Sequence, residues 1–405
     1  MPLSRLRRIL RSELVVQVES SNDLVLKVQA KVAARTQEFQ QKNKPLPIFK
    51  PIAPVPQFDG MAWTVRPISL LHKLGRMTTP RGLANMAKLS AGWATRRYFW
   101  AIAERTDQNV QFRLSRDALE LDFHQKSLLS DEFGIGMAGL FMEQHFEAAE
   151  SMDVSLALRD ELLAQQIEQS GQTQPDYLMW DGQPNPNYYL VECKGSQSGV
   201  AESVSQLRRG LEQLPSIEFA DPARHAASYV VATCLSGNGT TLYIIDPPEE
   251  DERKRRFSGE EVSERIGERR WKIKNVAELE KRNRVAKAAQ ILQWAGQNHR
   301  ALAAREQLEP LPDLGALPDL ATEVREISGA QYRGQVLPLF PELSPQLRVF
   351  LGVDQQMLTV AEEQAEVPFE LSHELAQRSA DLVQIPETDS ISADGTCMTI
   401  EGLPH

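Results

Sequence analysis

The chain has 405 residues, of which 41% are hydrophobic, and this composition supports two or three globular domains with ordinary packed cores. A disordered chain is therefore excluded. The formal net charge is -10, but residues 1–115 hold 19 Lys and Arg against 7 Asp and Glu, whereas residues 116–405 hold 26 against 48. The basic first part could bind a polyanion.

Cys193, Cys234 and Cys397 lie far apart and are odd in number, which is typical of neither a disulfide framework nor a zinc site. We therefore expect a reducing, cytoplasmic environment. No stretch approaches the roughly 18 consecutive apolar residues of a membrane-spanning helix, and the arginine-rich residues 1–11 lack the apolar segment of a secretory signal. A transit peptide would fit that start, but two glutamates follow closely.

Residues 1–115 are predicted to form a basic, mainly helical region. Apolar side chains at helical spacing indicate a helix over residues 22–41, and the prolines between Pro45 and Pro56 indicate an extended connector. Residues 62–105 interleave aromatic with basic side chains, a pattern that can stack nucleobases. We favour the simpler interpretation that these aromatics form a core with solvated charges around it.

The pattern of residues 116–246 predicts one compact α/β unit, in which helices alternate with β-hairpins. Its elements are expected at residues 131–150 (helix, with Ser130 as N-cap), 177–180 with 188–193 (hairpin), 203–214 (helix), and 227–234 with 241–245 (hairpin).

Two further segments are expected after this unit. Residues 247–305 are dense in charges of both signs and carry apolar residues at helical intervals, which predicts a charged helical segment. The last 105 residues hold 18 Asp and Glu, 5 Arg and no Lys. We predict that residues 306–405 form an acidic, mainly helical accessory module with one helix beginning at Ser344-Pro345.

The first hairpin brings two carboxylates together. If its loop is residues 182–186, residue 181 pairs with 187, and Asp176 then faces Glu192 on the same side of the sheet, about 5 Å apart at Cβ. Two like charges at that distance repel by roughly 3 kcal/mol at an effective dielectric of about 20. A bound Mg²⁺ or Mn²⁺ would compensate, because both ions prefer oxygen ligands.

Two neighbours of Glu192 could extend this site. Lys194 follows Glu192 by two residues and projects from the same face, where it can reach a water or a phosphate oxygen. The side chain of Cys193 points the other way, into packing, and its backbone carbonyl is a candidate metal ligand. A solvated charge cluster on a surface hairpin is the alternative interpretation.

The sequence Pro175-Asp176, a hairpin, and then Glu192-Cys193-Lys194-Gly195 resembles the signature of the PD-(D/E)XK, or restriction-endonuclease-like, nuclease superfamily. The order of elements agrees: helix, strand bearing Asp, strand bearing Glu and Lys, helix, strand. The resemblance covers about residues 130–246. It implies an α/β fold with a restriction-endonuclease-like core, in which helices flank a central mixed sheet.

The resemblance also implies roles. Asp176 and Glu192 would bind Mg²⁺, for which Mn²⁺ would substitute, and Lys194 would position or activate the attacking water. Members often add an acidic residue from the preceding helix. Here Glu143 is preferred, because Gly136 and Leu140 lie on its side of that helix; Glu147 is the reserve, and Glu150 also competes. Gln206, in the helix after the lysine, matches a polar position that some members use near the site.

The expected activity is metal-dependent hydrolysis of phosphodiester bonds, with 5′-phosphate and 3′-hydroxyl products implied by the resemblance. DNA is the favoured substrate, and Arg and Lys of residues 1–115 would contact its backbone. A defence or restriction role follows only by analogy, and a regulatory partner or a homo-oligomer would restrain cleavage. The alternatives are an RNase and a catalytically silent nuclease-fold binding or scaffold protein.

Two other sequence motifs lack the surroundings that their usual functions require. Residues 134–139 spell GxGxxG, but no strand precedes them, as a dinucleotide site requires. Residues 195–199 resemble a nucleophile elbow, yet Gln197 stands where that motif needs serine.

Overall fold

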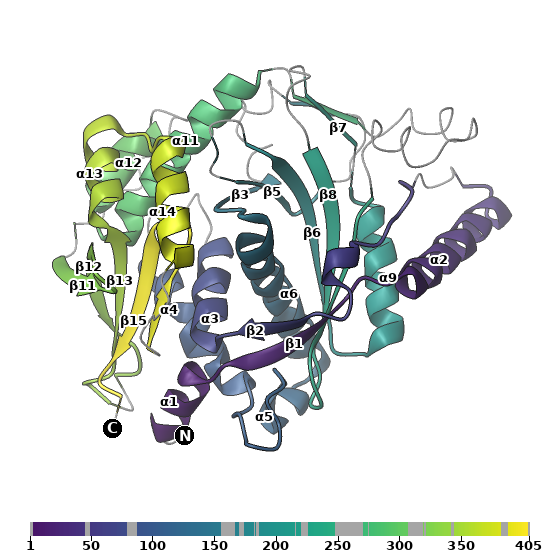
Figure 1. The fold of residues 1–405 in the computed structure, drawn as a ribbon, viewed down its shortest axis with the longest axis horizontal. Helices are drawn as coiled ribbons and strands as arrows, with labels where there is room; N and C mark the ends of the chain where they lie inside the picture. Colours follow the sequence, from purple (N-terminus) through teal and green to yellow (C-terminus); the bar gives the residue numbers. More distant parts are fainter. Residues whose placement is uncertain are drawn as a thin grey trace.

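The computed structural model describes the larger part of the chain, with gaps. The described residues are 3–44, 49–78, 87–154, 167–169, 174–181, 183, 186–214, 216–219, 226–247, 270–273, 275–306, 319, 321–341, 344–381 and 388–403. They form a central sheet flanked by helices and a second, C-terminal sheet with helices of its own (Figure 1). None of the described helices is long and apolar enough to cross a membrane.

The central sheet has seven strands and is mixed, in the order β2-β1-β9-β8-β6-β5-β3. The β1/β9 and β6/β8 pairs are parallel, and the other pairs are antiparallel. The strands are β1 (Leu14–Glu19), β2 (Ala62–Val65), β3 (Glu150–Asp153), β5 (Tyr177–Trp180), β6 (Tyr188–Ser196), β8 (Ala226–Cys234) and β9 (Thr241–Ile245). The α/β class and a mixed sheet flanked by helices are therefore as predicted.

Helices cover both faces of this sheet because successive strand residues point to opposite sides. On one face, Val191 and Cys193 join a buried core with α3 (Pro67–Met77) and α6 (Phe123–Phe146). On the other, Leu190 packs with α9 (Val200–Leu211) and α2 (Asn22–Gln41). The two helical layers are visible in Figure 1 on either side of β6 and β8.

Helix α6 begins earlier than predicted. The side chain of Asp122 accepts hydrogen bonds from the backbone N–H groups of His124 and Gln125 and so caps the helix at Phe123. Ser130, the expected N-cap, lies inside the helix and donates to the Lys126 carbonyl. The helix ends at Glu147, which has a φ of 55°, and the chain then enters β3.

The described part of the N-terminal region is rich in helix but also supplies two strands of the central sheet. It does contain the predicted helix α2, together with α1 (Leu3–Arg11) and α4 (Ala87–Tyr98), but it also supplies β1 and β2. Strand β1 lies parallel to β9, whose residues follow it by more than two hundred positions in the sequence. Such long-range pairing leaves no local pattern beyond six residues of alternating burial.

Both predicted hairpins and the helix between them are present as β5/β6, β8/β9 and α9. A small sheet of β4 (Ile167–Gln169), β10 (Arg270–Ile273) and β7 (Ser216–Phe219) lies apart from the central one. Short helical turns are η1 (Pro56–Phe58), η2 (Phe99–Ala101) and α5 (Arg116–Leu119). In the charged segment, α11 (Val276–Trp294) and α12 (Asn298–Glu306) are described, while residues 248–269 lie outside the described part.

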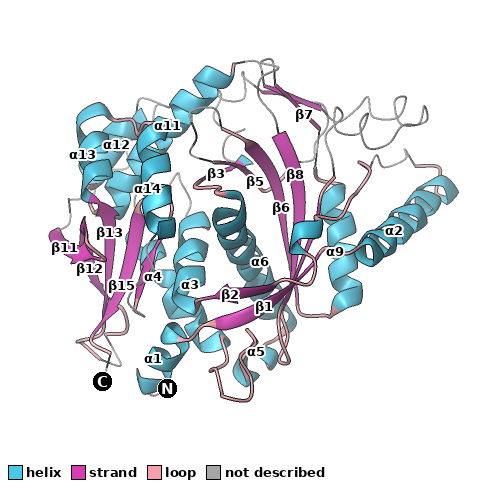
Figure 2. Cartoon of the chain, viewed as in Figure 1, coloured by secondary structure: helices cyan, strands magenta, loops and turns pink. Residues whose placement is uncertain are grey.

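The prediction of a mainly helical C-terminal module is wrong. Its described residues form a five-stranded antiparallel sheet in the order β11-β12-β13-β15-β14, covered by two helices (Figure 2). Residues 344–347 lead directly into β13 and not into a helix. The elements are β11 (Glu323–Ile327), β12 (Ala330–Pro338), β13 (Arg348–Asp354), α13 (Gln355–Gln364), α14 (Phe369–Asp381), β14 (Asp389–Ile391) and β15 (Thr396–Glu401). Strand β13 is buried on both faces, so it lacks the alternation that marks a half-exposed strand.

Candidate metal-dependent active site

The hairpin of β5 and β6 has the predicted register. Tyr177 pairs with Val191 and Trp180 with Tyr188, so the same register continued by one residue places Asp176 opposite Glu192. The backbone N–H of Asp176 donates to Glu192 Oε2 at 3.1 Å, and the backbone N–H of Cys193 donates to Asp176 Oδ2 at 2.8 Å. Each carboxylate is thus fixed by the strand that carries the other.

Glu192 is buried beneath helix α9, and Gly210 makes this possible. A Cβ added at Gly210 would lie 2.4 Å from Val230 Cγ1 and 3.0 Å from Glu192 Cγ. The Glu192 side chain is 0% exposed, whereas the Asp176 side chain is 33% exposed. The pair therefore has a closed inner end at Glu192 and an end open to solvent at Asp176.

Lys194 closes this arrangement on the same face of β6. Its Nζ forms an ion pair with Glu192 Oε1 and lies 3.9 Å from Asp176 Oδ2, and its side chain is 17% exposed. The side chain of Cys193, between them in sequence, is buried in the core on the opposite face. The predicted meeting of Asp176, Glu192 and Lys194 is therefore confirmed as geometry.

The two carboxyl groups resist joint ionisation. Burial, together with the neighbouring Asp176 charge, raises the pKa of Glu192 to about 8. Burial also raises the pKa of Asp176. Burial lowers the pKa of the Lys194 ammonium, but the Glu192 and Asp176 carboxylates outweigh it and leave that pKa above its ordinary value. The site thus favours a bound positive charge.

Asp131, which is not among the predicted site residues, is the acidic residue that α6 brings to this site. A Cβ at Gly134 would lie 2.8 Å from the Lys194 carbonyl oxygen, and one at Gly195 would lie 1.7 Å from the Ser130 carbonyl oxygen, so helix and strand touch through their backbones. Burial raises the pKa of Asp131, while Lys194 lowers it. The Asp131 charge in turn raises the pKa of Asp176.

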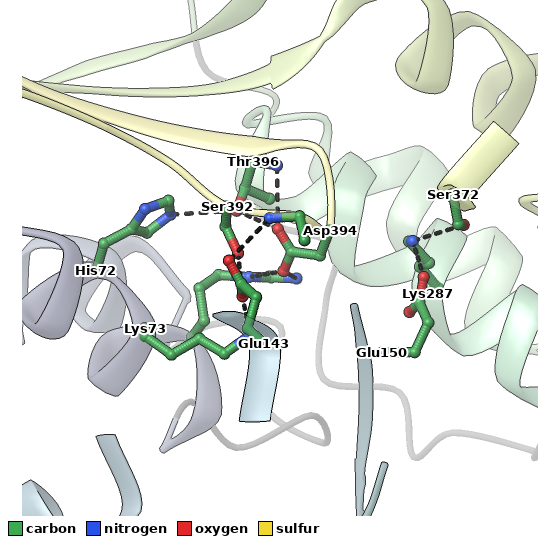
Figure 3. Close-up of polar contacts among 11 residues, drawn as sticks. His72, Lys73, Glu143, Glu150, Lys287, Ser372, Ser392, Asp394 and Thr396 are labelled. Carbon is green, nitrogen blue, oxygen red and sulfur yellow. Dashed lines mark hydrogen bonds and ion pairs between the residues drawn. The ribbon is translucent and has the colours of Figure 1, made fainter. Parts of the chain in front are cut away.

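The structure places Glu143, the preferred helix residue, elsewhere. Glu143 follows Asp131 by twelve residues, about 18 Å along an α-helix. It pairs with Lys73 and accepts hydrogen bonds from the Ser392 hydroxyl and the Ala393 N–H of the C-terminal module (Figure 3). Gly136, which suggested Glu143, faces the side chains of α3 and not the sheet.

The other proposed residues also have different surroundings. Glu150 forms a buried ion pair with Lys287, which also contacts Ser372 (Figure 3). Glu147 ends α6. The Gln206 amide donates to Glu202 Oε1 at 3.3 Å within α9, and no contact described for it reaches Asp176, Glu192 or Lys194.

The donor set fits a hard divalent cation. Asp176 and Glu192 offer carboxylate oxygens, and the Cys193 backbone adjoins both through its N–H bond to Asp176. Side chains alone provide two ligands, since within the described ranges no three His, Cys, Asp or Glu residues are grouped to hold a metal. Backbone carbonyl and water oxygens would have to complete the coordination.

The GxGxxG motif is explained by packing. Gly134, Gly136 and Gly139 all lie within α6, where the first abuts the backbone of β6 and the other two abut α3. A Cβ at Gly139 would lie 1.9 Å from Met77 Sδ. The motif therefore does not follow a strand, in agreement with its rejection as a dinucleotide site.

Comparison with known proteins adds no relative: no protein-family model matches the chain, and neither the curated proteins nor the solved structures give a significant match.

Proposed function

We propose that this protein is a metal-dependent nuclease that hydrolyses phosphodiester bonds, with DNA as the favoured substrate. The proposal rests on one observation, the opposed carboxylates of Asp176 and Glu192 with the Lys194 ammonium between them. The resemblance of these residues to the PD-(D/E)XK signature, and their place in an α/β fold with a mixed sheet, support it.

Asp176, Glu192 and the Cys193 carbonyl would hold Mg²⁺ or Mn²⁺. When bound, such an ion supplies charge stabilisation to the phosphate and makes hydroxide available near neutral pH. The protein's own residues shape the site around the ion. Glu192, buried and fixed by the Asp176 N–H, sets the inner limit of the site, and Asp176 faces its open end.

Lys194 is suited to a second role. Its ammonium stays charged, because the neighbouring carboxylates raise its pKa, and it is partly exposed. It can donate a hydrogen bond to a phosphate oxygen or to the attacking water. Asp131 lies close enough to affect the pKa of Asp176, and we assign it a positioning role through Lys194.

Sequence-independent affinity would come from basic residues of the first 115 positions. Arg96 and Arg97 of α4 are exposed, although Arg96 donates to the Pro338 carbonyl and Arg97 lies over the Trp93 and Tyr98 rings. Their charges remain available to phosphate through solvent. Reversing both charges should weaken nucleic-acid binding and flatten its dependence on salt.

The direct test is a cleavage assay on supercoiled plasmid, linear duplex DNA, single-stranded DNA and RNA, each with Mg²⁺, with Mn²⁺ and with chelator. Cleavage should require the metal and be lost in Asp176→Asn. The matched control is Asp23→Asn, because the Asp23 side chain on α2 is 70% exposed and pairs only with its helix neighbour Lys27 among the contacts described.

Each outcome discriminates between the alternatives. Cleavage of RNA alone would replace the DNA assignment with that of an RNase. If the wild-type protein binds nucleic acid but cleaves none of the substrates with either metal, the catalytically silent scaffold becomes the better account. Equal activity of Asp176→Asn and Asp23→Asn would rule out this site as the catalytic centre.

A further inference from the structure

A cavity of about 440 Å³ lies between the core and the C-terminal module. Its walls come from α3 and the end of α6 on one side, and from α14 and β14 on the other. This volume falls within the range of small-molecule sites. Glu143, which lines it, is twelve helix residues from Asp131, so the cavity is distinct from the proposed active site.

A chain of hydrogen bonds fixes the polarity of one wall (Figure 3). Burial raises the pKa of Asp394, but Arg76 and Lys73 outweigh it and keep that carboxyl ionised. The Thr396 hydroxyl must therefore donate to Asp394 Oδ1, at 2.5 Å, and its oxygen accepts from His72 Nε2 at 3.1 Å.

This series of hydrogen bonds ends at Ser390, which lines the cavity. Burial lowers the pKa of His72 to about 3, so the ring is neutral and has one N–H, on Nε2. Its Nδ1 then accepts from the Ser390 hydroxyl at 3.0 Å. Because the Ser390 proton is committed to His72, Ser390 can offer a ligand only its lone pairs and acts as an acceptor.

Gln144 on the facing wall has the complementary polarity. Its Oε1 accepts from Trp63 Nε1 at 2.7 Å, which orients the amide and leaves the NH₂ group as a donor for a ligand. A ligand that spans the cavity thus meets a donor at Gln144 and an acceptor at Ser390.

The Arg and Lys side chains in the walls are already engaged, and the exposed Glu147 adds a negative charge. Lys73 pairs with Glu143, which also accepts from Ser392 and Ala393, and Arg66 donates to the Asp389 carbonyl at 2.9 Å. A polyanion would therefore gain little over a neutral or singly charged ligand. Leu140 and Ile391 add apolar surface beside these polar groups.

We propose that this cavity binds a nucleoside. Such a molecule combines an apolar ring face with donors and acceptors on its edge, hydroxyl groups, and no charge. These are the properties that the walls complement. The proposal does not depend on nuclease activity, because binding can be measured with the metal chelated.

The test is equilibrium binding of adenosine, guanosine, cytidine, uridine and their 5′-monophosphates to the full chain in chelator, measured by calorimetry. At least one nucleoside should bind with a Kd below about 1 mM and raise the melting temperature, and its 5′-monophosphate should bind less tightly. Ser69→Trp places a bulky side chain in the cavity and should weaken that binding at least tenfold. Ser205→Trp, on the exposed side of α9, is the matched control and should leave it unchanged.

A second, more conservative variant keeps the test valid if Ser69→Trp does not fold. Ser390→Ala removes the acceptor oxygen, together with the hydrogen bond that Ser390 donates to His72 Nδ1, and should weaken binding about tenfold, the effect of one hydrogen bond lost to the ligand. The proposal is overturned if none of the four nucleosides binds, if both cavity variants bind as tightly as the wild type, or if a 5′-monophosphate binds more tightly than its nucleoside.

Discussion

Replacing Glu192 with glutamine should stabilise the metal-free protein. In the unfolded chain this carboxyl has its ordinary pKa of 4.5, while burial and Asp176 raise the folded value to about 8. Folding at neutral pH therefore requires the uptake of a proton. Each pKa unit corresponds to about 1.36 kcal/mol, so the interval from 4.5 to pH 7 destabilises the folded state by roughly 3 kcal/mol. Glutamine removes this penalty.

Part of this gain is offset because the glutamine amide replaces the carboxyl group that contacts Lys194, although Lys194 keeps Asp176 at 3.9 Å. We expect a net stabilisation of about 1–3 kcal/mol at pH 7. Because the folded pKa of Glu192 is raised, its ionisation destabilises the folded wild-type protein. This destabilisation is absent below pH 4.5, grows up to pH 8 and is constant above it. The difference between variant and wild type should grow over the same range.

Urea unfolding at pH 5, 6, 7 and 8 in chelator measures this difference. The wild type should lose stability relative to Glu192→Gln as the pH rises. Asp23→Asn, an exposed carboxyl, is the control and should follow the wild type at every pH. A variant that is less stable than the wild type at pH 7, or an equal difference at pH 5 and pH 8, would refute the assigned electrostatics.

Three further predictions concern other residues of the core. Lys194→Ala should abolish cleavage while the circular dichroism spectrum stays that of the wild type; substantial remaining activity would argue against its role. Gly210→Ala should destabilise the protein by about 1–3 kcal/mol in urea unfolding, because the new Cβ would lie 2.4 Å from Val230 Cγ1; an unchanged midpoint would mean that α9 shifts freely. Glu143→Gln should leave cleavage intact but cost about 3 kcal/mol, since it breaks the buried pair with Lys73; lost cleavage in a folded variant would return Glu143 to the site.

The part of the site that the sequence could predict is the part that depends on local geometry. The loop length fixes the hairpin register, and the two-residue period of a strand then puts Asp176, Glu192 and Lys194 on one face. These relations hold wherever the hairpin lies in the fold. The same applies to α9 and to the second hairpin.

Asp131 could not be found in this way, because its place depends on where α6 crosses β6. That crossing is set by the backbone contact of Gly134 with Lys194 and of Ser130 with Gly195, which joins segments about sixty residues apart. The prediction places Gly136 against the sheet, but Gly136 faces α3 and Gly134 makes the contact with β6. The first half of the helix therefore lies at the site.

Two larger features of the fold could not be predicted for a similar reason. The pairing of β1 with β9 joins opposite ends of the core, and the sheet of the C-terminal module joins β13 to β15 across two helices. Strand β13 is buried on both faces and lacks the alternating pattern by which strands are recognised, and the alternation of β1 spans only six residues and does not reveal its distant partner.

The most direct test of the metal site is calorimetric titration of Mn²⁺ into the wild-type protein and into the double variant Asp176→Asn, Glu192→Gln. The wild type should bind Mn²⁺, since the cation relieves the paired carboxylates, and the double variant, which keeps the side-chain shapes but loses both charges, should not. Equal binding by the two proteins would show that these carboxylates are not a metal site and would contradict the proposed nuclease.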